Sequence, residues 1–254
     1  MERIRAVMIE CVTVCVNFCD YLKLTLPGQK HYFDHIIIVT DSKDEETQQY
    51  CEEENLICVV TDVFYEGKVT VIQEKWLKYS EDHRELIEIK DAEFDSIFNK
   101  GRALNEGFKH LKFNEWVAVV DADTAVENSS FEKYVMYELG NLNKKRLYGP
   151  AGRILISDNF IPNWKENIKR WSYSDLVSCL DVNGSNMDGY FQLFHYDTVK
   201  DEKEWYPEHC PSANFCDVVF GEKIRDKYSV ERLPFMTFHL GETFTHHKGR
   251  VKNA

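Results

Sequence analysis

The chain has 254 residues, of which 43% are hydrophobic and 13% aromatic, and its formal net charge is −12. This composition excludes a disordered protein, because the apolar surface available for burial can offset the entropy that is lost on folding. The acidic balance argues against bulk nucleic acid as a partner, since binding to a phosphate backbone needs a basic face. Acidic clefts suit divalent cations, so a metal-assisted reaction on an anionic substrate stays open.

The sequence predicts no transmembrane segment, because no run of about 18 uninterrupted apolar residues is present. The apolar run at residues 6–16 contains Glu10 and is not followed by a small-residue cleavage site, which favours a buried strand over a signal peptide. The eight cysteines form no Cys-x-x-Cys pair, which argues against a zinc ribbon or a thioredoxin-like site. We therefore expect reduced thiols and a cytoplasmic protein.

Apolar runs of strand length alternate with helical patterns in the first half of the chain. The runs span residues 7–16, 35–40, 56–60 and 116–120. Helices are expected at residues 44–55, where Ser42 and Glu45 form a capping box, and at residues 98–111. Buried strands separated by helices predict an α/β protein with a Rossmann-like, mostly parallel sheet.

Two stretches break this alternation. The highly charged residues 66–95 predict a helix plus a mobile loop, and after about residue 147 the strands become irregular, at residues 147–150, 189–194 and 235–240. No Pro/Gly-rich linker separates the parts. The expectation is one domain, residues 1–254, made of a regular part (1–125) and a smaller mixed part (126–254).

Polar residues follow the predicted strands at one edge of the sheet. Asn17, Asp41, Asp62 and Asp121 each come directly after, or one residue after, an apolar run. Because ligands of open parallel sheets bind at the carboxyl ends of the strands, these residues locate a candidate site.

Asp121-x-Asp123 is the only Asp-x-Asp sequence in the chain. Two carboxylates at the end of a buried strand suit Mg²⁺ or Mn²⁺, which prefers oxygen ligands and also binds substrate phosphates. The alternative is a solvated turn whose aspartates cap the next segment.

A basic helix start lies just upstream of that strand, in residues 98–105. Lys100 and Arg102 at a helix N-terminus predict a diphosphate-binding site, because backbone N–H groups also point outward there. The alternative is a helix whose first turn carries solvated basic residues.

Two residues late in the chain are candidates for chemistry. His239 follows an apolar run and is a candidate third metal ligand, although a hydrogen-bonded core histidine is the alternative. Asp217 lies among apolar residues, which favours a raised pKa and a role as general base. Its alternative is an N-cap for a helix that begins near Val218.

The order of these parts resembles the nucleotide-sugar glycosyltransferases of the GT-A fold. The resemblance covers roughly residues 7–250, and its most specific pieces are residues 98–105, 117–123, 189–194 and 239–241. It implies a metal-dependent enzyme that moves a sugar from a nucleotide diphosphate sugar, a UDP-sugar first of all, to a hydroxyl of a glycan or another acceptor. Residues 1–125 would then be the nucleotide-sugar-binding half and residues 126–254 the acceptor-binding half.

The resemblance also implies a role for each matching residue. Mn²⁺ or Mg²⁺ would bind at Asp121, Asp123 and His239, and Asp188, Gly189 and Tyr190 would border the sugar and the acceptor. Asp217 would be the base of an inverting transfer, although this chain has Cys216-Asp217 where the family commonly has Glu-Asp. The donor nucleotide would be bound by Asn17, Thr40, Asp41, Asp62, Asn99, Lys100 and Asp121.

Two other classes remain open. A nucleotidyltransferase on a similar sheet would use the same carboxylates and metal, but it would normally carry a Gly-rich loop after the first strand. A non-catalytic module that binds nucleotide sugars or glycans would keep the fold and lose the transfer.

Overall fold

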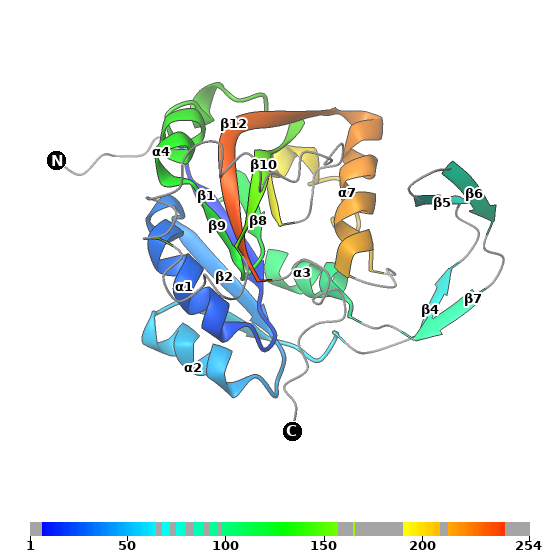
Figure 1. Ribbon diagram of the computed structural model, residues 1–254, viewed down its shortest axis with the longest axis horizontal. Coiled ribbons are helices and arrows are strands. Elements are labelled where there is room, and N and C mark those ends of the chain that lie inside the picture. The colour runs from blue at the N-terminus through cyan, green and yellow to red at the C-terminus, as the bar shows by residue number, and fades with distance from the viewer. Residues whose placement is uncertain are drawn as a thin grey trace.

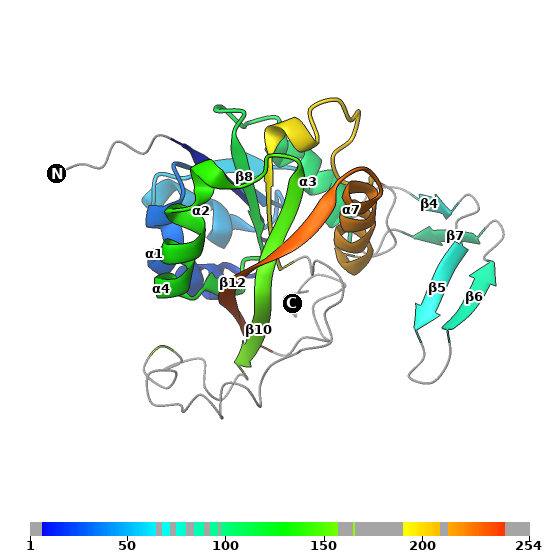
Figure 2. The same ribbon diagram turned by 90° about the horizontal axis from the view of Figure 1, so that it is seen from above.

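The computed structural model describes residues 7–64, 68–71, 75–79, 84–88, 92–95, 98–156, 165, 190–208 and 213–241. One eight-stranded sheet, in the order β3-β2-β1-β8-β11-β10-β12-β9, forms the centre of the molecule. Figures 1 and 2 show this sheet with helices packed against it. Its strands are β1 (Ile9–Val14), β2 (His35–Thr40), β3 (Ile57–Val60), β8 (Trp116–Val120), β9 (Thr124–Val126), β10 (Arg146–Ile156), β11 (Phe191–His195) and β12 (Ser229–Leu240).

The sheet is parallel in its first half and mixed in its second half. β2 pairs in parallel with β3 and with β1, and β1 pairs in parallel with β8. β11 is antiparallel to both β8 and β10, while β10 and β12 are parallel. β9 then pairs antiparallel with β12 and forms the edge. The expected fold class is confirmed, and strands from both parts of the chain share the same sheet.

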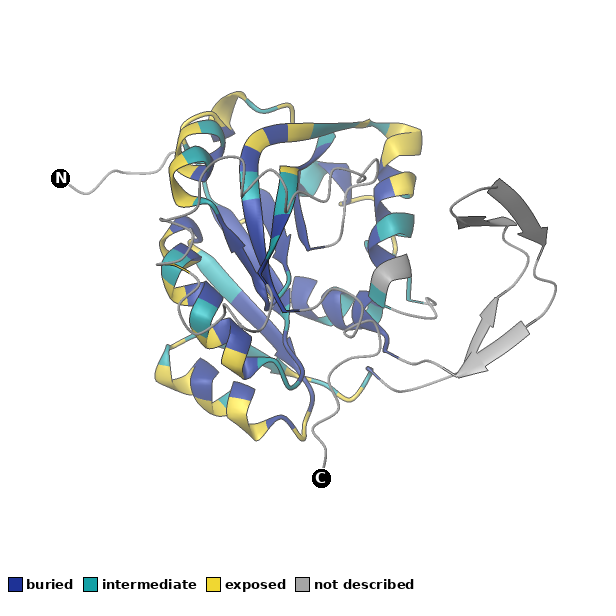
Figure 3. Cartoon of the chain, viewed as in Figure 1, coloured by how far each residue is buried: buried dark blue, intermediate teal, exposed yellow. Residues whose placement is uncertain are grey.

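Helices cover both faces of the sheet (Figure 1). On one face, α3 (Lys100–Phe108) and α7 (Ala213–Lys227) bury apolar side chains against alternate residues of the strands, such as Val12 and Val119. The intervening residues, such as Cys11 and Ala118, belong to clusters on the opposite face. That face is covered by α1 (Cys19–Gln29), α2 (Glu45–Glu53) and α4 (Asn128–Phe131). Figure 3 shows the strands buried between these two layers.

Four short helical turns lie between these elements in the described ranges. They are η1 (Lys30–Tyr32), η2 (Glu132–Met136), η3 (Leu139–Asn141) and η5 (Tyr196–Thr198). No helix in the described part of the chain is both long enough and apolar enough to cross a membrane.

The prediction for residues 66–95 is wrong. The described parts of this stretch form two hairpin pairs, β4 with β7 and β5 with β6, rather than a helix. These strands are β4 (Lys68–Val71), β5 (Lys75–Tyr79), β6 (Arg84–Glu88) and β7 (Ala92–Asp95).

Two predicted helix starts also need correction. The N-cap of α2 is Asp44, whose side chain accepts a hydrogen bond from the Thr47 N–H, so Ser42 does not form the expected capping box. α7 begins at Ala213, four residues before Asp217. Asp217 therefore lies inside the helix, and its alternative reading as an N-cap is excluded.

Candidate functional site

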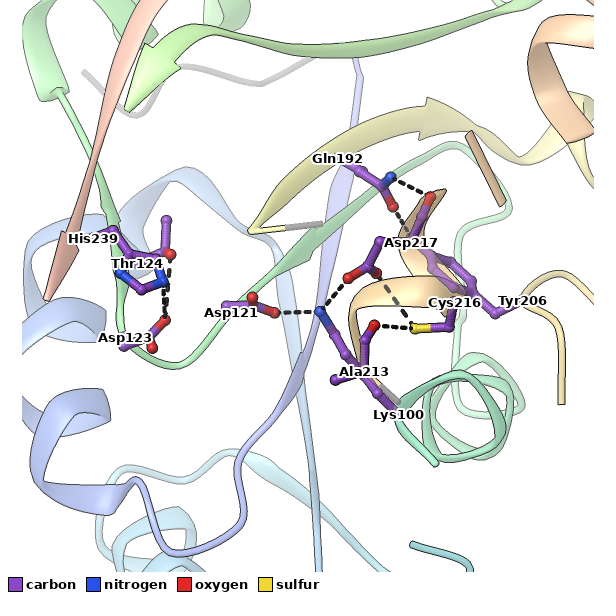
Figure 4. Close-up of polar contacts among 10 residues, drawn as sticks. All are labelled: Lys100, Asp121, Asp123, Thr124, Gln192, Tyr206, Ala213, Cys216, Asp217 and His239. Carbon is purple, nitrogen blue, oxygen red and sulfur yellow. Dashed lines mark hydrogen bonds and ion pairs between the residues drawn. The ribbon is translucent and has the colours of Figure 1, made fainter. Parts of the chain in front are cut away.

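Lys100, Asp121 and Asp217 form an ionic cluster at the carboxyl end of β8, in which Lys100 and Asp217 are buried and Asp121 is half-buried. Lys100 opens α3, Asp121 follows β8, and Asp217 lies in the second turn of α7. The Lys100 Nζ atom lies 2.7 Å from Asp121 Oδ1 and 3.0 Å from Asp217 Oδ2. Figure 4 shows the ammonium group between the two carboxylates. The residue that was expected to bind diphosphate is therefore bonded to the residue that was expected to act as base.

The cluster changes the proton affinity of its members. Burial raises the pKa of Asp217 to about 6, Lys100 opposes this rise, and Asp121 adds to it. Burial alone would lower the pKa of Lys100, but Asp121 and Asp217 together hold that pKa above its ordinary value. Lys100 thus stays protonated, while Asp217 changes charge near neutral pH.

Neighbouring polar groups hold Asp217 in place. The Cys216 thiol donates to the backbone oxygen of Ala213 at 3.0 Å and lies 3.6 Å from Asp217 Oδ1. The Gln192 amide donates to the Asp217 backbone oxygen at 3.4 Å, and the Tyr206 hydroxyl bonds to Gln192. These contacts are drawn in Figure 4. Where the resembling family commonly has a second acid, this chain has a thiol that helps to fix the helix.

Asp123 and His239 form a second pair, on the other side of the turn that follows β8 (Figure 4). His239 Nε2 lies 3.6 Å from Asp123 Oδ1, and both side chains are 8% exposed. The pairing of β9 with β12 sets this position, because His239 is opposite Thr124. A distance of 3.6 Å is too long for a hydrogen bond, so the two groups face one another at ion-pair distance.

The pair fits two ligands of one divalent cation. Asp123 would bind such a cation through a carboxylate oxygen, and His239 would bind it through Nε2. The His239 Nδ1 atom is buried and has no hydrogen-bond partner among the described residues. A carboxylate and an imidazole together suit Mn²⁺.

The expected three-residue ligand set is not brought together. No group of three or more His, Cys, Asp or Glu side chains in the described ranges is placed to hold a metal. Asp121 belonged to that predicted set, but Figure 4 shows its side chain directed to Lys100 and away from Asp123. The remaining ligands of a cation at Asp123 and His239 would therefore come from substrate or water.

The ends of β1, β2 and β3 bring Asn17, Asp41 and Asp62 to the same sheet edge. Asn17 is half-buried and adopts a left-handed backbone conformation, with φ of 60°. Asp41 is buried and accepts a bond from the Lys43 N–H at 2.8 Å. Asp62 is exposed and accepts a bond of 2.5 Å from the Ser42 hydroxyl.

Asp44 organises this edge, although the sequence pattern did not mark it as a site residue. Its buried carboxylate accepts bonds from the Asn17 N–H at 2.6 Å, the Thr40 hydroxyl at 3.2 Å and the Thr47 hydroxyl at 2.6 Å. Thr40, expected among the nucleotide-binding residues, is fully buried and directed to Asp44. In the sequence, Asp44 is marked only as a residue of a type that often caps helices, placed just before a predicted helix. Ser42 fits the same description.

The Asn99 side chain also bonds to neighbouring parts of the protein. Its side chain caps α3 by accepting a bond from the Arg102 N–H at 3.2 Å, and it donates to the Glu208 backbone oxygen at 2.7 Å. The residue therefore fixes the helix start that carries Lys100.

The sugar and acceptor side is described in part. Asp188 and Gly189 lie outside the described residues. Tyr190 is buried, its backbone oxygen accepts a bond from the Asp121 N–H at 3.0 Å, and the Arg153 guanidinium lies 5.1 Å from its ring centre. Tyr190 is thus adjacent to Asp121 of the cluster.

No known protein-family profile and no curated protein matches this sequence. Solved structures do match its fold. Glucosyl-3-phosphoglycerate synthase from Mycobacterium tuberculosis, in complex with Mn²⁺, UDP and phosphoglyceric acid, matches with a TM-score of 0.50 and 10% identity over 93% of this chain and 72% of its own. The same enzyme with Mn²⁺, UDP-glucose and phosphoglyceric acid matches with a TM-score of 0.52 and 10% identity, over 93% of this chain and 73% of its own.

GalNAc-T7 with UDP, GalNAc and Mn²⁺ matches with a TM-score of 0.52 and 12% identity. The match covers 94% of this chain but only 44% of GalNAc-T7. The similarity therefore extends over nearly all of this chain. The fold is that of the GT-A glycosyltransferases, as the sequence resemblance predicted.

Proposed function

We propose that the protein is a metal-dependent glycosyltransferase that moves a sugar from a nucleotide diphosphate sugar, most simply a UDP-sugar, to an acceptor hydroxyl. The observation that carries this proposal is the facing pair of Asp123 and His239, 3.6 Å apart, at the ligand-binding edge of a GT-A sheet. The structural neighbours that share this fold hold UDP and Mn²⁺, which supports the choice of donor and cation.

The charge at the site supports a requirement for a cation. Asp121, Asp123 and Asp217 carry three negative charges when ionised, and Lys100 supplies one positive charge between two of them. A diphosphate brought to this edge without another cation would meet net negative charge. Mn²⁺ or Mg²⁺ held by Asp123 and His239 supplies the missing charge and, when bound, stabilises the negative charge that develops on the leaving diphosphate.

The residues of this chain then have distinct tasks. Lys100, kept protonated by its two carboxylates, directs positive charge toward the leaving diphosphate. The proposed nucleoside contacts are Asn17, Asp41 and Asp62 at the ends of the first three strands. Thr40 and Asn99 are proposed to act indirectly. Thr40 bonds to Asp44, and Asn99 caps the start of α3.

Asp217 is the proposed proton acceptor of the transfer, in which case the reaction inverts the anomeric configuration. Its raised pKa gives it a higher proton affinity than an ordinary carboxylate, and above about pH 6 it is ionised and able to accept a proton. Asp188, Gly189 and Tyr190 are proposed to border the sugar and a glycan or other hydroxyl acceptor. A cytoplasmic setting is proposed because the six described cysteines are free thiols, five of them buried.

The test combines binding with chemistry. Melting temperatures are measured with UDP-, GDP- and dTDP-sugars, with Mn²⁺ and with EDTA, and release of nucleoside diphosphate is followed by chromatography. We expect one class of donor to stabilise the protein only with Mn²⁺ and to release its diphosphate. Stabilisation with no release would favour a non-catalytic binding module, and release of pyrophosphate from a nucleoside triphosphate would favour a nucleotidyltransferase.

A further inference from the structure

The turn at residues 121–124 is held on its outer side by α1. This turn joins β8 to β9 and carries both Asp121 and Asp123, and it is closed by a bond of 3.0 Å from the Thr124 N–H to the Asp121 backbone oxygen. On its inner side, the Leu240 N–H donates to the Asp123 backbone oxygen at 2.8 Å. The contacts on the opposite side come from two buried polar residues of the helix, Thr25 and Gln29.

Gln29 bonds to β9 as a neighbouring strand would. Among the described strands β9 lies at the edge of the sheet, and its Thr124 C=O and Val126 N–H both point away from β12. The Gln29 amide donates to the Thr124 oxygen at 3.0 Å and accepts from the Val126 N–H at 3.0 Å. A side-chain amide has the same donor and acceptor as a peptide group, so this one residue satisfies the edge as a strand would.

Thr25 lies one helical turn before Gln29 on the same face of α1. Its hydroxyl lies 2.8 Å from the Ala122 backbone oxygen, closer than to the helix carbonyls of Tyr21 at 3.2 Å and Leu22 at 3.4 Å. Together the two side chains bind the backbone at residues 122, 124 and 126. Asp123 therefore lies between two backbone carbonyls that α1 holds in place.

We propose that Thr25 and Gln29 are positioning residues for the metal site. They hold the turn so that the Asp123 carboxylate faces His239, and they act on the cation only through Asp123. The inference rests on the proposed function, since it concerns the same cation. It predicts that loss of either side chain weakens Mn²⁺ binding, although both proposed ligands, Asp123 and His239, are still present.

The test measures the Mn²⁺ concentration that gives half-maximal UDP binding. The variants are Gln29→Met, Gln29→Glu, which keeps only the acceptor, Thr25→Val, which keeps the shape without the hydroxyl, and Thr25→Ser, which restores the hydroxyl. We expect Gln29→Met and Thr25→Val to raise the half-saturating Mn²⁺ concentration about 10- to 100-fold, the range for partners that orient a ligand. The half-saturating Mn²⁺ concentration of Gln29→Glu should lie between those of the wild type and Gln29→Met. That of Thr25→Ser should remain near the wild-type value.

Two controls separate positioning from loss of stability. Gln49→Met makes the same chemical change on the exposed face of α2, where the Gln49 amide donates to Glu53 at 2.8 Å. Tyr148→Phe removes a buried hydroxyl that bonds to the Asn143 backbone, away from the turn. Both should leave the half-saturating Mn²⁺ concentration unchanged, whatever their effect on the melting temperature.

Hydrogen exchange at the Val126 N–H tests the hydrogen bond between Val126 and Gln29 independently of Mn²⁺ and UDP binding. Gln29→Met should raise this exchange rate at least about 10-fold, and an unchanged rate overturns the inference. Faster exchange with unchanged Mn²⁺ dependence also overturns it, because Gln29 would then protect the strand only. If Gln29→Met does not fold, Thr25→Val and Gln29→Glu decide the question. Wild-type protein that binds none of UDP, GDP and dTDP with Mn²⁺ overturns the proposed function and this inference together, whereas normal wild-type binding with unaffected variants overturns the inference alone.

Discussion

The Lys100 ammonium group lies 3.0 Å from the Asp217 carboxylate, in a cluster that also contains Asp121. Lys100 and Asp217 each shift the pKa of the other, so we expect a change at either residue to act both on stability and on the proposed chemistry.

Replacing Asp217 with Asn should change how the stability of the protein depends on pH. The pKa of Asp217 in the folded protein is about 6, above its ordinary value near 3.8, mainly because of burial. Between these pH values the folded state binds more protons than the unfolded state, so the contribution of this group to stability is full below about pH 4 and is lost by about pH 6. Urea unfolding of both proteins from pH 4 to pH 7 should show the wild type losing stability relative to Asp217→Asn across this window. A constant difference would contradict the raised pKa.

The same variant tests the role of Asp217 in catalysis. If Asp217 accepts the acceptor proton, Asp217→Asn should keep donor binding and lower the single-turnover rate by about 10²- to 10⁴-fold. The wild-type rate should rise with pH through about 6 as the carboxylate ionises. A product with the same anomeric configuration as the donor would exclude the inverting mechanism.

Lys100→Met should destabilise the protein strongly. It leaves Asp121 and Asp217 without their shared cation, and the loss of one partner of a buried pair costs about 3–5 kcal/mol. Adding Asp217→Asn should recover part of this loss, since one unpaired charge is then removed. The matched control is Lys109→Met, because Lys109 is exposed and pairs with Glu106 at 2.7 Å, a kind of contact that contributes about 0–1 kcal/mol. Denaturant unfolding of the four proteins measures these differences.

Binding to Lys100→Met answers a separate question. If Lys100 contacts the diphosphate, the variant should weaken UDP binding much more than uridine binding, because the lost partner is the phosphate charge. Equal losses for both ligands would restrict Lys100 to holding the two carboxylates.

Asp123→Asn and His239→Gln should each remove most of the Mn²⁺-dependent affinity for UDP. The double variant should lose little more than either single variant, because both residues serve one cation. Calorimetry with Mn²⁺ and with EDTA measures this, and Asp197→Asn, at an exposed aspartate paired with Lys200, is the control. Equal UDP affinity in wild-type protein with and without Mn²⁺ would contradict the metal site.

Gly101→Ala should move the helix that carries Lys100. An added Cβ would lie 2.3 Å from the Pro207 backbone oxygen and 3.1 Å from Cys216 Cβ, so the first turn of α3 must shift, at a cost of about 1–3 kcal/mol. At Gly28 in α1 the nearest atom would be Lys165 Nζ at 3.5 Å, which is an ordinary contact. Gly28→Ala should therefore be neutral or stabilising by up to about 1 kcal/mol. Equal melting temperatures for the two variants would contradict this difference.

Features with a local cause could be predicted from the sequence. The apolar runs of β2 and β8 match the observed strands, because a strand buried on both faces requires continuous apolar residues. The polar residues that end these runs share one edge because parallel strands end together. The order of the motifs was enough to predict the fold.

Features that depend on distant contacts could not be predicted. Lys100 and Asp217 are 117 residues apart, and nothing near either residue indicates the other. α1 contains Pro27 and Gly28, which are poor helix formers, and it is stabilised by packing on the sheet through Leu22 and Leu26. Ser42 and Asp44 both fit the start of α2, and only the contacts of Asp44 with Asn17 and Thr40 decide between them.

The place of β9 has a consequence for synthesis on the ribosome. β9 follows β8 directly in the chain but lies at the far edge of the sheet, beyond β12. A growing chain that ends before Ser229 would contain Asp123 without His239, and β9 would lack β12, the strand with which it pairs. The pair that we assign to the cation is thus completed only when β12 joins the sheet. Tight Mn²⁺ binding by a nascent chain would report that the last strand has reached its place.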